Sequence, residues 1–216
     1  MNKAPARLGL VAGFLALCLV AGAGRAQSVV IAPDDMVMGS PKAPITVVEY
    51  GSVGCPHCGT WARDVFPAFK AKYIDTGQVK FVFREVLMGD PAMAAAGFLT
   101  ARCAGKAKYF QVVDAIFDAQ PEMARTGEDM PSLNLIALQA GLTQAKFAAC
   151  LGDHVALAAL QARSDRYLAQ DHITGTPTFM VGEQRLQAGV QSLAAMTIAV
   201  SLEQQKITDA ARRKAR

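Results

Sequence analysis

The chain has 216 residues and a formal net charge of +4, and 52% of its residues are hydrophobic. Residues 1–26 contain three basic and no acidic side chains, so without them 19 basic and 18 acidic residues remain and the net charge is +1. This small charge argues against a nucleic acid as partner, and the four basic residues among the last six predict only a solvated end. The remaining length suits one domain, or one domain with a large insertion.

Residues 1–26 have the pattern of a secretory signal peptide. Lys3 and Arg7 precede the uncharged apolar run Leu8–Ala23. The small residues Gly24 and Ala26 suit cleavage after Ala26. A membrane-spanning helix is the alternative, but this run of 16 residues is shorter than the roughly 20 that a span requires. We therefore expect a protein that is exported to the periplasm and loses this segment.

The next part of the chain predicts a βαβ unit. Residues 27–44 contain several prolines and glycines and read as an extended lead-in. The β-branched run Ile45–Tyr50 predicts a buried strand, and apolar residues then recur at helical spacing from Cys58 until Gly77 ends the helix. Val79–Val86 predicts a second strand, which completes the unit.

Residues 90–171 are rich in alanine and leucine and contain no strand-like run, so they predict four or five helices. Strand character returns in Thr178–Val181 and Arg185–Ala188, a predicted hairpin, and a last helix is expected from Ser192 to about Lys206. The predicted class is therefore α/β with a helical block inserted into the chain. We assign residues 27–89 and 172–206 to the α/β domain, 90–171 to the insertion and 207–216 to a basic, flexible tail.

The motif Cys55-Pro56-His57-Cys58 lies between the first predicted strand and the first predicted helix. A sulfur at a helix start meets unpaired backbone N–H groups and the positive end of the helix dipole, which favour the thiolate. His57 can add a donor or a positive charge near that sulfur, and Pro56 presets the backbone for the helix. A lower thiol pKa stabilises the reduced form and makes the disulfide a stronger oxidant. The motif thus predicts redox chemistry in which Cys55 exchanges disulfides and Cys58 resolves them.

Two other uses of this cysteine pair are less consistent with the sequence. A zinc site needs four ligands, but the sequence has no second CxxC or CxxH pair, and His154 and His172 stand singly. A purely structural disulfide between Cys55 and Cys58 would gain little from closing so short a loop. We therefore expect no metal, and the sequence has no flavin or nucleotide signature that would predict another cofactor.

The motif, preceded by a strand that contains Glu49 and followed far downstream by Thr174-Gly175-Thr176-Pro177-Thr178-Phe179, resembles the DsbA family of periplasmic thiol oxidoreductases. The resemblance extends from about Gly39 to Lys206 and implies a thioredoxin fold interrupted by a helical insertion. It also implies a strongly oxidising cysteine pair and no bound cofactor. The implied partners are reduced or unfolded exported polypeptides and a membrane quinone-linked thiol oxidase of DsbB type, which would re-oxidise the pair.

The resemblance also implies roles for individual residues. Cys55 would be the exposed nucleophile and Cys58 its buried partner. Pro177 would be a cis-proline that faces the disulfide, and Thr176 would pair with a substrate segment through its backbone. Glu49 would exchange protons with the inner thiol, although a salt bridge between Glu49 and Arg84 is an alternative.

Thr176 is the one position that departs from the oxidase pattern. Threonine before the cis-proline is more usual in isomerase-type relatives, whereas the namesake oxidase has an apolar residue there. Isomerases of this group also need an N-terminal dimerisation domain, for which residues 27–38 are too few. We therefore expect a monomeric oxidase, with an isomerase or reductase, or a peptide-holding chaperone on the same fold, as alternatives.

Cys103 and Cys150 both fall in the predicted helical block, near helix ends. Some bacterial members of the family carry a second disulfide in this block, and in an oxidising compartment a bridge is favoured over two buried thiols. A bridge between them would close a loop of about 47 residues and contribute about 4 kcal/mol in the chain-entropy account.

Overall fold

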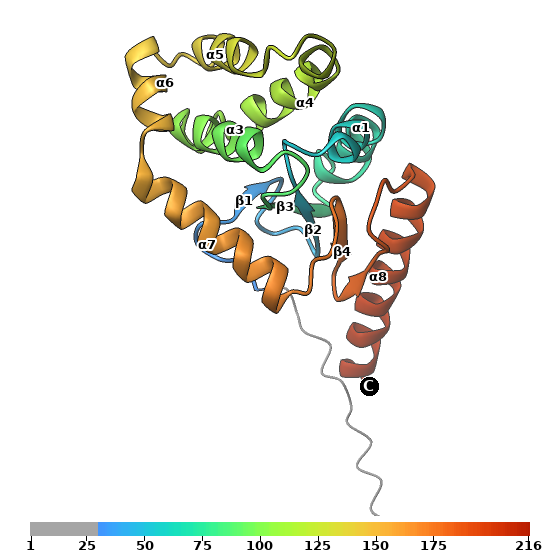
Figure 1. The fold of residues 1–216 in the computed structure, drawn as a ribbon. Helices are drawn as coiled ribbons and strands as arrows, with labels where there is room; N and C mark the ends of the chain where they lie inside the picture. Colours follow the sequence, from blue (N-terminus) through green and yellow to red (C-terminus); the bar gives the residue numbers. More distant parts are fainter. Residues whose placement is uncertain (1–29) are drawn as a thin grey trace, which may run out of the picture.

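The centre of the molecule is a five-stranded β-sheet with the strand order β1-β3-β2-β4-β5 (Figure 1). The computed structural model describes residues 30–216, so the predicted signal peptide, residues 1–26, lies outside the described residues. β2 pairs in parallel with β3 and antiparallel with β4, as a βαβ unit followed by a returning strand requires. The strands are β1 Met36–Met38, β2 Ile45–Gly51, β3 Val79–Glu85, β4 Thr178–Val181 and β5 Gln184–Arg185.

Helices pack on both faces of this sheet, and four of them, α3 to α6, gather in a block beyond it (Figure 1). α7 leaves the block and runs along the sheet, and α8 lies on the other side beside β4. The helices are α1 Pro56–Asp64, α2 Phe66–Phe69, the π-helical turn η1 Lys70–Ile74, α3 Pro91–Cys103, α4 Tyr109–Thr126, α5 Asp129–Gln139, α6 Gln144–Leu151, α7 His154–Gln170 and α8 Leu193–Lys214. This is the predicted α/β class with its helical insertion.

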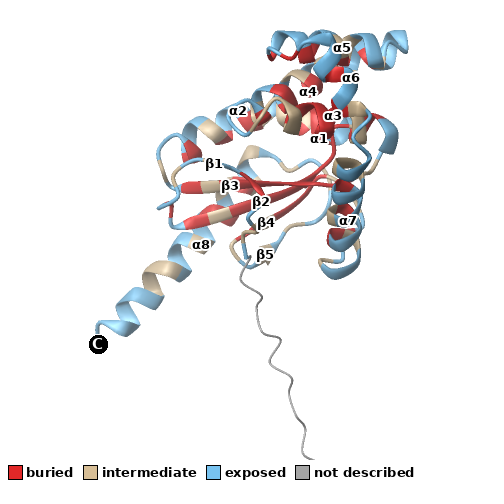
Figure 2. Ribbon diagram, turned by 90° about the vertical axis from the view of Figure 1, so that its left-hand side faces the viewer, coloured by how far each residue is buried: buried red, intermediate tan, exposed pale blue. Residues whose placement is uncertain are grey.

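β2 is buried on both faces because the sheet lies between two apolar clusters (Figure 2). Val47 packs into the larger cluster, which also takes side chains from α1, α3, α4, α5, α6 and α8. Its neighbour Val48 points the other way, toward the smaller cluster that contains Tyr167 of α7. A strand covered on both faces has no need of polar alternation, which is why the sequence showed a β-branched run here.

Several helices begin at residues whose side chains cap them. The Asp90 carboxylate accepts a hydrogen bond from the Met93 N–H at 2.9 Å, and the Thr143 hydroxyl accepts one from the Lys146 N–H at 3.2 Å. Five helices lie between residues 90 and 171, so the prediction of four or five is confirmed. Since each cap satisfies an N–H that its helix leaves unpaired, these ends are fixed locally.

The first helix differs from the prediction of one continuous helix up to Gly77. It breaks at Val65, whose φ of −121° is not helical, and it resumes as α2 and η1. Pro67 lies in the first turn of α2, where its missing N–H is tolerated, but the same residue cannot continue a helix from α1. Gly77, with φ +73°, still ends the segment as predicted.

Two predictions for the C-terminal part are wrong. β5 is only Gln184–Arg185, not Arg185–Ala188, because the Gly189 N–H turns back to the Pro177 carbonyl at 2.8 Å and takes the chain out of the sheet. The predicted flexible tail, residues 207–216, is helical as far as Lys214. This segment contains no glycine or proline, and its last-turn basic residues favour the negative end of the helix dipole.

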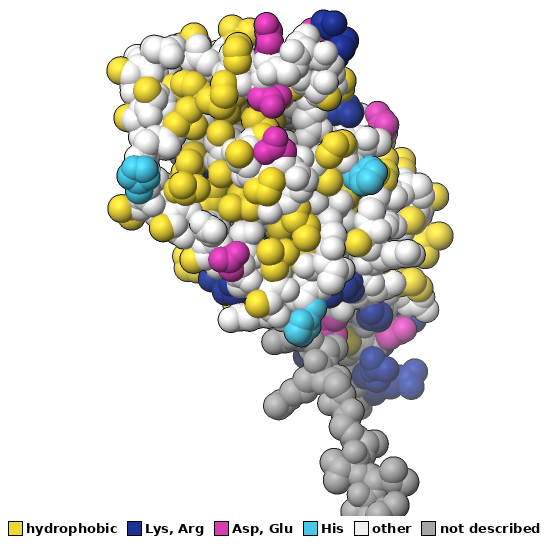
Figure 3. Space-filling view, viewed as in Figure 1, with side chains coloured by type: hydrophobic (Ala, Val, Ile, Leu, Met, Phe, Trp, Pro, Cys, Tyr) yellow, Lys and Arg dark blue, Asp and Glu magenta, His cyan; other side chains and the backbone are white. Residues whose placement is uncertain are grey.

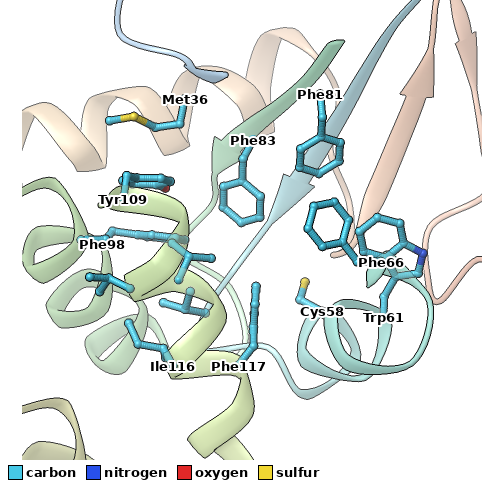
Figure 4. Packing of buried hydrophobic residues seen from close by; sticks show 14 of the residues in the cluster. Met36, Cys58, Trp61, Phe66, Phe81, Phe83, Phe98, Tyr109, Ile116 and Phe117 are labelled. Atoms are coloured by element: carbon cyan, nitrogen blue, oxygen red, sulfur yellow. The ribbon is translucent and has the colours of Figure 1, made fainter. Parts of the chain in front are cut away.

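Large aromatic side chains fill the core beneath α1 (Figure 4). Trp61 is 1% exposed, and its ring centroid lies 4.5 Å from that of Phe179 and 5.4 Å from that of Phe66. The Cys58 sulfur points toward this aromatic cluster (Figure 4). Burial of such rings stabilises the fold and surrounds the second cysteine, Cys58, with apolar side chains.

Among residues 30–216, no helix combines the length and the apolar character that crossing a membrane requires.

Candidate active site

Cys55 lies at the start of α1, where the chain turns out of β2. It is the N-cap residue, with φ −105° and ψ 119°, and Pro56 is the first helical residue. The side chain of Cys55 is 7% exposed and that of Cys58 is fully buried. The outer and inner positions are therefore as the resemblance implies, but Cys55 is more enclosed than the exposed nucleophile expected, because the loop that contains Thr176 covers it.

The two thiols have opposite pKa shifts. A hydrogen bond from the Cys58 thiol lowers the pKa of the Cys55 thiol to about 5, against the opposing effect of burial. The Thr176 hydroxyl and the backbone N–H groups of His57 and Cys58 lower the pKa further. Cys55 is thus a thiolate at neutral pH, which is the nucleophilic form.

Cys58 is the opposite case. Burial raises the pKa of the Cys58 thiol well above its ordinary value, and the Cys55 sulfur and the Glu49 carboxylate raise it further. A hydrogen bond from the Ser52 N–H to Cys58 Sγ, at 3.4 Å, acts in the other direction but is weaker. Cys58 therefore carries a proton whenever the pair is reduced.

We expect iodoacetamide to alkylate Cys55 of the reduced protein at a rate that reaches half its maximum near pH 5. Because the folded-state pKa is lowered, the thiolate stabilises the reduced fold fully above about pH 9 and this stabilisation is lost as the pH falls through about 5. Mass spectrometry of the alkylated peptide measures the rate, and urea unfolding of reduced wild type and Cys55→Ala at several pH values measures the stability. A half-maximal rate near the ordinary thiol value of about 8.5 would contradict this prediction.

The loop before β4 brings Thr176 and Pro177 to the cysteine pair, although both are far away in sequence. The Thr176–Pro177 peptide bond is cis. Cys55 Sγ lies 3.4 Å from the Thr176 carbonyl oxygen, to which the thiol donates a hydrogen bond when it is protonated. Thr176, one of the two residues for which the resemblance implies a substrate contact, therefore lies directly beside the outer sulfur, and Pro177 follows it in the chain.

The other two residues of the motif are exposed. Pro56 begins α1, as the sequence predicts. In residues 30–216 the imidazole of His57 makes no hydrogen bond, and His57 acts on Cys55 through its backbone N–H. The predicted role of its side chain stays a prediction.

Glu49 lies in β2, two strand positions before the strand ends, and it is 2% exposed. The alternative of an ion pair between Glu49 and Arg84 is wrong. Tyr50, not Glu49, is the partner of Arg84 across the β2–β3 ladder, and successive strand residues point to opposite faces. Arg84 pairs with Asp35 at 3.2 Å and with Asp171 at 3.3 Å on the face of the sheet opposite to Glu49.

Gln120 of α4 holds the backbone of the cysteine motif, a role that the sequence did not reveal. Its side-chain amide donates hydrogen bonds to the Val53 carbonyl at 2.7 Å and to the Cys55 carbonyl at 3.2 Å. Next to it, the Asp90 N–H donates to the Gly54 carbonyl at 2.9 Å. A Cβ atom on Gly54 would lie 2.2 Å from the Asp90 carbonyl oxygen, so only glycine permits this approach.

Pro121 explains how α1 is joined to α4. A proline inside a helix cannot donate to the carbonyl four residues earlier, here that of Phe117. Arg63 of α1 donates to that carbonyl instead. The motif helix is therefore held against the helical block by a polar contact as well as by apolar packing.

Cys103 at the end of α3 and Cys150 in α6 form a disulfide, with their Cα atoms 6.2 Å apart. This bridge lies within the helical block, whereas Cys55 and Cys58 are the free pair of the described chain. In residues 30–216 no group of three or more His, Cys, Asp or Glu side chains could hold a metal ion. The histidine side chains visible in Figure 3 are well separated from one another.

The family model described as Thioredoxin matches residues 32–200, which is most of the chain. The chain belongs to the thioredoxin family. Among solved structures, alpha-DsbA1 of Wolbachia pipientis superposes with a TM-score of 0.73 at 27% sequence identity, covering 83% of this chain and 96% of that one. The resemblance to DsbA proteins inferred from the motif is therefore shown by the fold as well.

Curated relatives of this thioredoxin-family chain have related names. A protein of Rickettsia conorii, provisionally named a protein-disulfide oxidoreductase, is 33% identical over 176 residues, and the match covers 80% of this chain. The match spans only 62% of that relative's length. Disulfide bond formation protein D of Bacillus subtilis is 45% identical over 51 residues, 24% of this chain and 23% of that protein.

Sequence reasoning missed two residues of this thioredoxin-family site, Gln120 and Asp114, both on α4. Asp114 lines a cavity that it shares with Glu49. The only sequence signal for Gln120 is that it precedes Pro121 within a helix. Because Pro121 has no N–H, it marks a turn of the helix in which one backbone carbonyl needs a donor from another element. For Asp114 the sequence gives no signal, because an acidic residue in an amphipathic helix is ordinary.

Proposed function

We propose that the chain is a thiol:disulfide oxidoreductase that acts as an oxidase, donating its Cys55–Cys58 disulfide to dithiols of polypeptides. The observation that carries this proposal is the pair of opposite pKa shifts, with Cys55 lowered to about 5 and Cys58 raised. A stabilised Cys55 thiolate makes the reduced form favourable, and so the disulfide form tends to take electrons.

The reaction proceeds by two thiol–disulfide exchanges. A substrate thiolate attacks Cys55 Sγ, the Cys55–Cys58 bond breaks, and Cys58 leaves and takes up a proton. The second substrate thiol, after loss of its proton, attacks the substrate sulfur of the mixed disulfide, and Cys55 leaves as a thiolate. Two electrons pass from the substrate to the cysteine pair, and the substrate gains one disulfide. The low pKa of Cys55 favours its departure in the second step.

The surroundings of Cys55 suit an extended polypeptide. With Cys55 as a thiolate or in the disulfide, the Thr176 carbonyl accepts no hydrogen bond from it and is free to pair with a substrate segment. Beside Pro56 lies a cavity of about 410 Å³ with both apolar and polar walls. Its apolar lining comes from Val53, Pro56, Met93, Pro121, Met123 and Ala124. Figure 3 shows further apolar side chains gathered over the helical block on this face.

The proposal includes the cellular context that the family resemblance implies. The protein would act in the periplasm as a monomer, on newly exported polypeptides, and a membrane quinone-linked oxidase of DsbB type would re-oxidise it. The pattern of residues 1–26 supports export. The reaction itself requires only the two sulfurs, which is consistent with a protein that binds no cofactor.

The test of the proposed function is the reduction potential of the Cys55–Cys58 pair, measured by equilibrating the chain without residues 1–26 in glutathione buffers. A value toward about −120 mV, that of the family's namesake, supports the oxidase function. A value near the about −270 mV of thioredoxin would reverse the direction and make the chain a reductase.

Thr176 is the residue that favours the second candidate, an isomerase, because threonine precedes the cis-proline in isomerase-type relatives. Its hydroxyl lowers the pKa of Cys55. We therefore expect Thr176→Val to raise the pKa of Cys55 and to shift the equilibrium with glutathione roughly tenfold toward the disulfide form, since hydrogen bonds to charged groups contribute about 1.5–3 kcal/mol. Thr178→Val, in the same loop, is the control, because the Thr178 hydroxyl donates to the Gly175 carbonyl instead. Equal shifts in both variants would contradict this role of Thr176.

A further inference from the structure

A small cavity lies beneath the active site, enclosed by β2, β3, α1, α2 and α4. Its volume is about 10 Å³, which is at the lower limit of what a cavity needs to hold one water molecule. Two of its lining side chains are carboxylic acids, Glu49 from β2 and Asp114 from α4. The others are apolar: Trp61, Ala62, Phe66, Phe81, Phe83, Phe110, Val113 and Phe117. Several of these rings are seen around the Cys58 sulfur in Figure 4.

Glu49 is the inner group of this cavity. Its Oε1 atom is fully buried and has no hydrogen-bond partner in residues 30–216. Burial raises the pKa of Glu49 well above its ordinary value, and Asp114 and Cys55 raise it further. The charge of Glu49 in turn raises the pKa of the Cys58 thiol, so Glu49 interacts electrostatically with Asp114 and with both thiols of the active pair. A buried carboxyl group with a raised pKa favours its protonated form, and it needs a polar partner through which to exchange the proton.

Asp114 is the outer group. It also lines a second cavity, of about 400 Å³, between α1, η1 and α4, together with Arg63, Lys70 and Asp118. Asp114 is exposed, and within residues 30–216 it is the only titratable side chain that lines both cavities. Burial of part of its carboxyl and the nearby Asp118 raise the pKa of Asp114 to about 6, with Lys70 acting against them. Such a group takes up and releases protons readily near neutral pH.

We propose that Asp114 is the outer relay of a proton path that joins the Cys58 thiol, through Glu49 and one water in the small cavity, to the solvent. This inference rests on the proposed function. When the substrate thiolate attacks Cys55 Sγ and the disulfide breaks, the leaving Cys58 sulfur takes a proton from Glu49. The Glu49 carboxylate then recovers a proton from Asp114 through the water, and Asp114 recovers one from solvent. Re-oxidation of the pair runs the same transfers in reverse.

The geometry explains why an outer relay is needed. Phe83 is the ladder partner of Glu49 on β3, and Phe179 is its partner on β4, so both neighbouring strands present apolar rings at this level. α4 supplies the polar side chain that this part of the sheet lacks. Asp114 acts through Glu49 and touches neither sulfur, so it is a positioning and relay residue rather than a catalytic one.

The test compares Asp114→Asn with Glu122→Gln, a loss of one carboxylate from an exposed position of the same helix that lines neither cavity. Oxidised protein is mixed rapidly with dithiothreitol at low buffer concentration, and the fluorescence of Trp61, the chain's one tryptophan, follows reduction. We expect Asp114→Asn to be roughly tenfold slower than wild type, less than the 10²–10⁴-fold effect of removing a direct general acid. Glu122→Gln should stay within about twofold of wild type.

Chemical rescue separates a relay from a structural role. Added imidazole, a small proton carrier, should restore the rate of Asp114→Asn in proportion to its concentration and leave wild type and Glu122→Gln unchanged. Asp114→Glu, which keeps the carboxyl group, should react at close to the wild-type rate. An Asp114→Asn variant that is as fast as wild type, or one that is slow but indifferent to imidazole, overturns the proposal. A wild-type protein with a thioredoxin-like potential would instead overturn the proposed function, and the two failures are therefore distinct.

Discussion

Replacement of Cys55 by serine is expected to abolish dithiol oxidation, with a fall in rate of at least about a thousandfold, because the variant has no disulfide to exchange. Cys58→Ser should behave differently. Its Cys55 sulfur, still a thiolate at neutral pH, attacks a disulfide of another molecule, but nothing resolves the product. We expect a stable mixed disulfide at Cys55, visible by mass spectrometry under non-reducing conditions. The reverse outcome, an adduct on Cys58 in Cys55→Ser, would contradict the assignment because that sulfur is fully buried.

These variants also separate the oxidase from a peptide-holding chaperone. A chaperone would suppress aggregation of an unfolded polypeptide equally well with both Cys55 and Cys58 replaced by serine, and its loss-of-function phenotype would be absent in the double variant. The oxidase function predicts that the double variant forms no disulfides in a reduced substrate. The matched control is Cys103→Ala/Cys150→Ala, which also removes two cysteines but leaves the active pair in place.

Removal of the Cys103–Cys150 disulfide is expected to lower the free energy of unfolding by about 4 kcal/mol. The bridge spans 47 residues of sequence and joins α3 to α6, so without it the unfolded chain gains the freedom of a long loop. Urea unfolding of Cys103→Ala/Cys150→Ala, with the Cys55–Cys58 pair held oxidised in both proteins, measures the difference. Because the bridge contacts neither active-site sulfur, the reduction potential should stay within the error of the wild-type value.

A change below about 1 kcal/mol would contradict this prediction, since packing in the helical block would then constrain the chain without the bridge. Ala149→Ser, next to Cys150 but exposed, serves as the control for a small surface change in α6 and should shift the stability by less than about 0.5 kcal/mol.

The sequence alone determined those features of this protein that depend on neighbours along the chain. The run Ile45–Tyr50 is apolar and β-branched because it is covered on both faces, and Asp90 caps α3 by accepting from the N–H of Met93, three residues ahead. Cys55 lies at a helix start because the motif and its proline specify that junction locally. Two helix boundaries were predicted wrongly although their causes are local. Pro67 breaks the first helix at Val65, and α8 continues to Lys214 because no proline interrupts it.

Only the tertiary structure decided how α4 meets the sheet. Glu49 and Asp114 are 65 residues apart and belong to no common sequence pattern, so nothing in the sequence indicates that both line one small cavity. Gln120 reaches the Cys55 carbonyl only because the helical block folds back over α1. Strand pairing likewise turned Arg84 away from Glu49, since a one-residue difference in register exchanges the faces of a sheet. The disulfide chemistry of Cys55 and Cys58 could be predicted from the residues of the motif. The proposed proton path to solvent depends on the packing of β2 against α4, two segments that are distant in the chain.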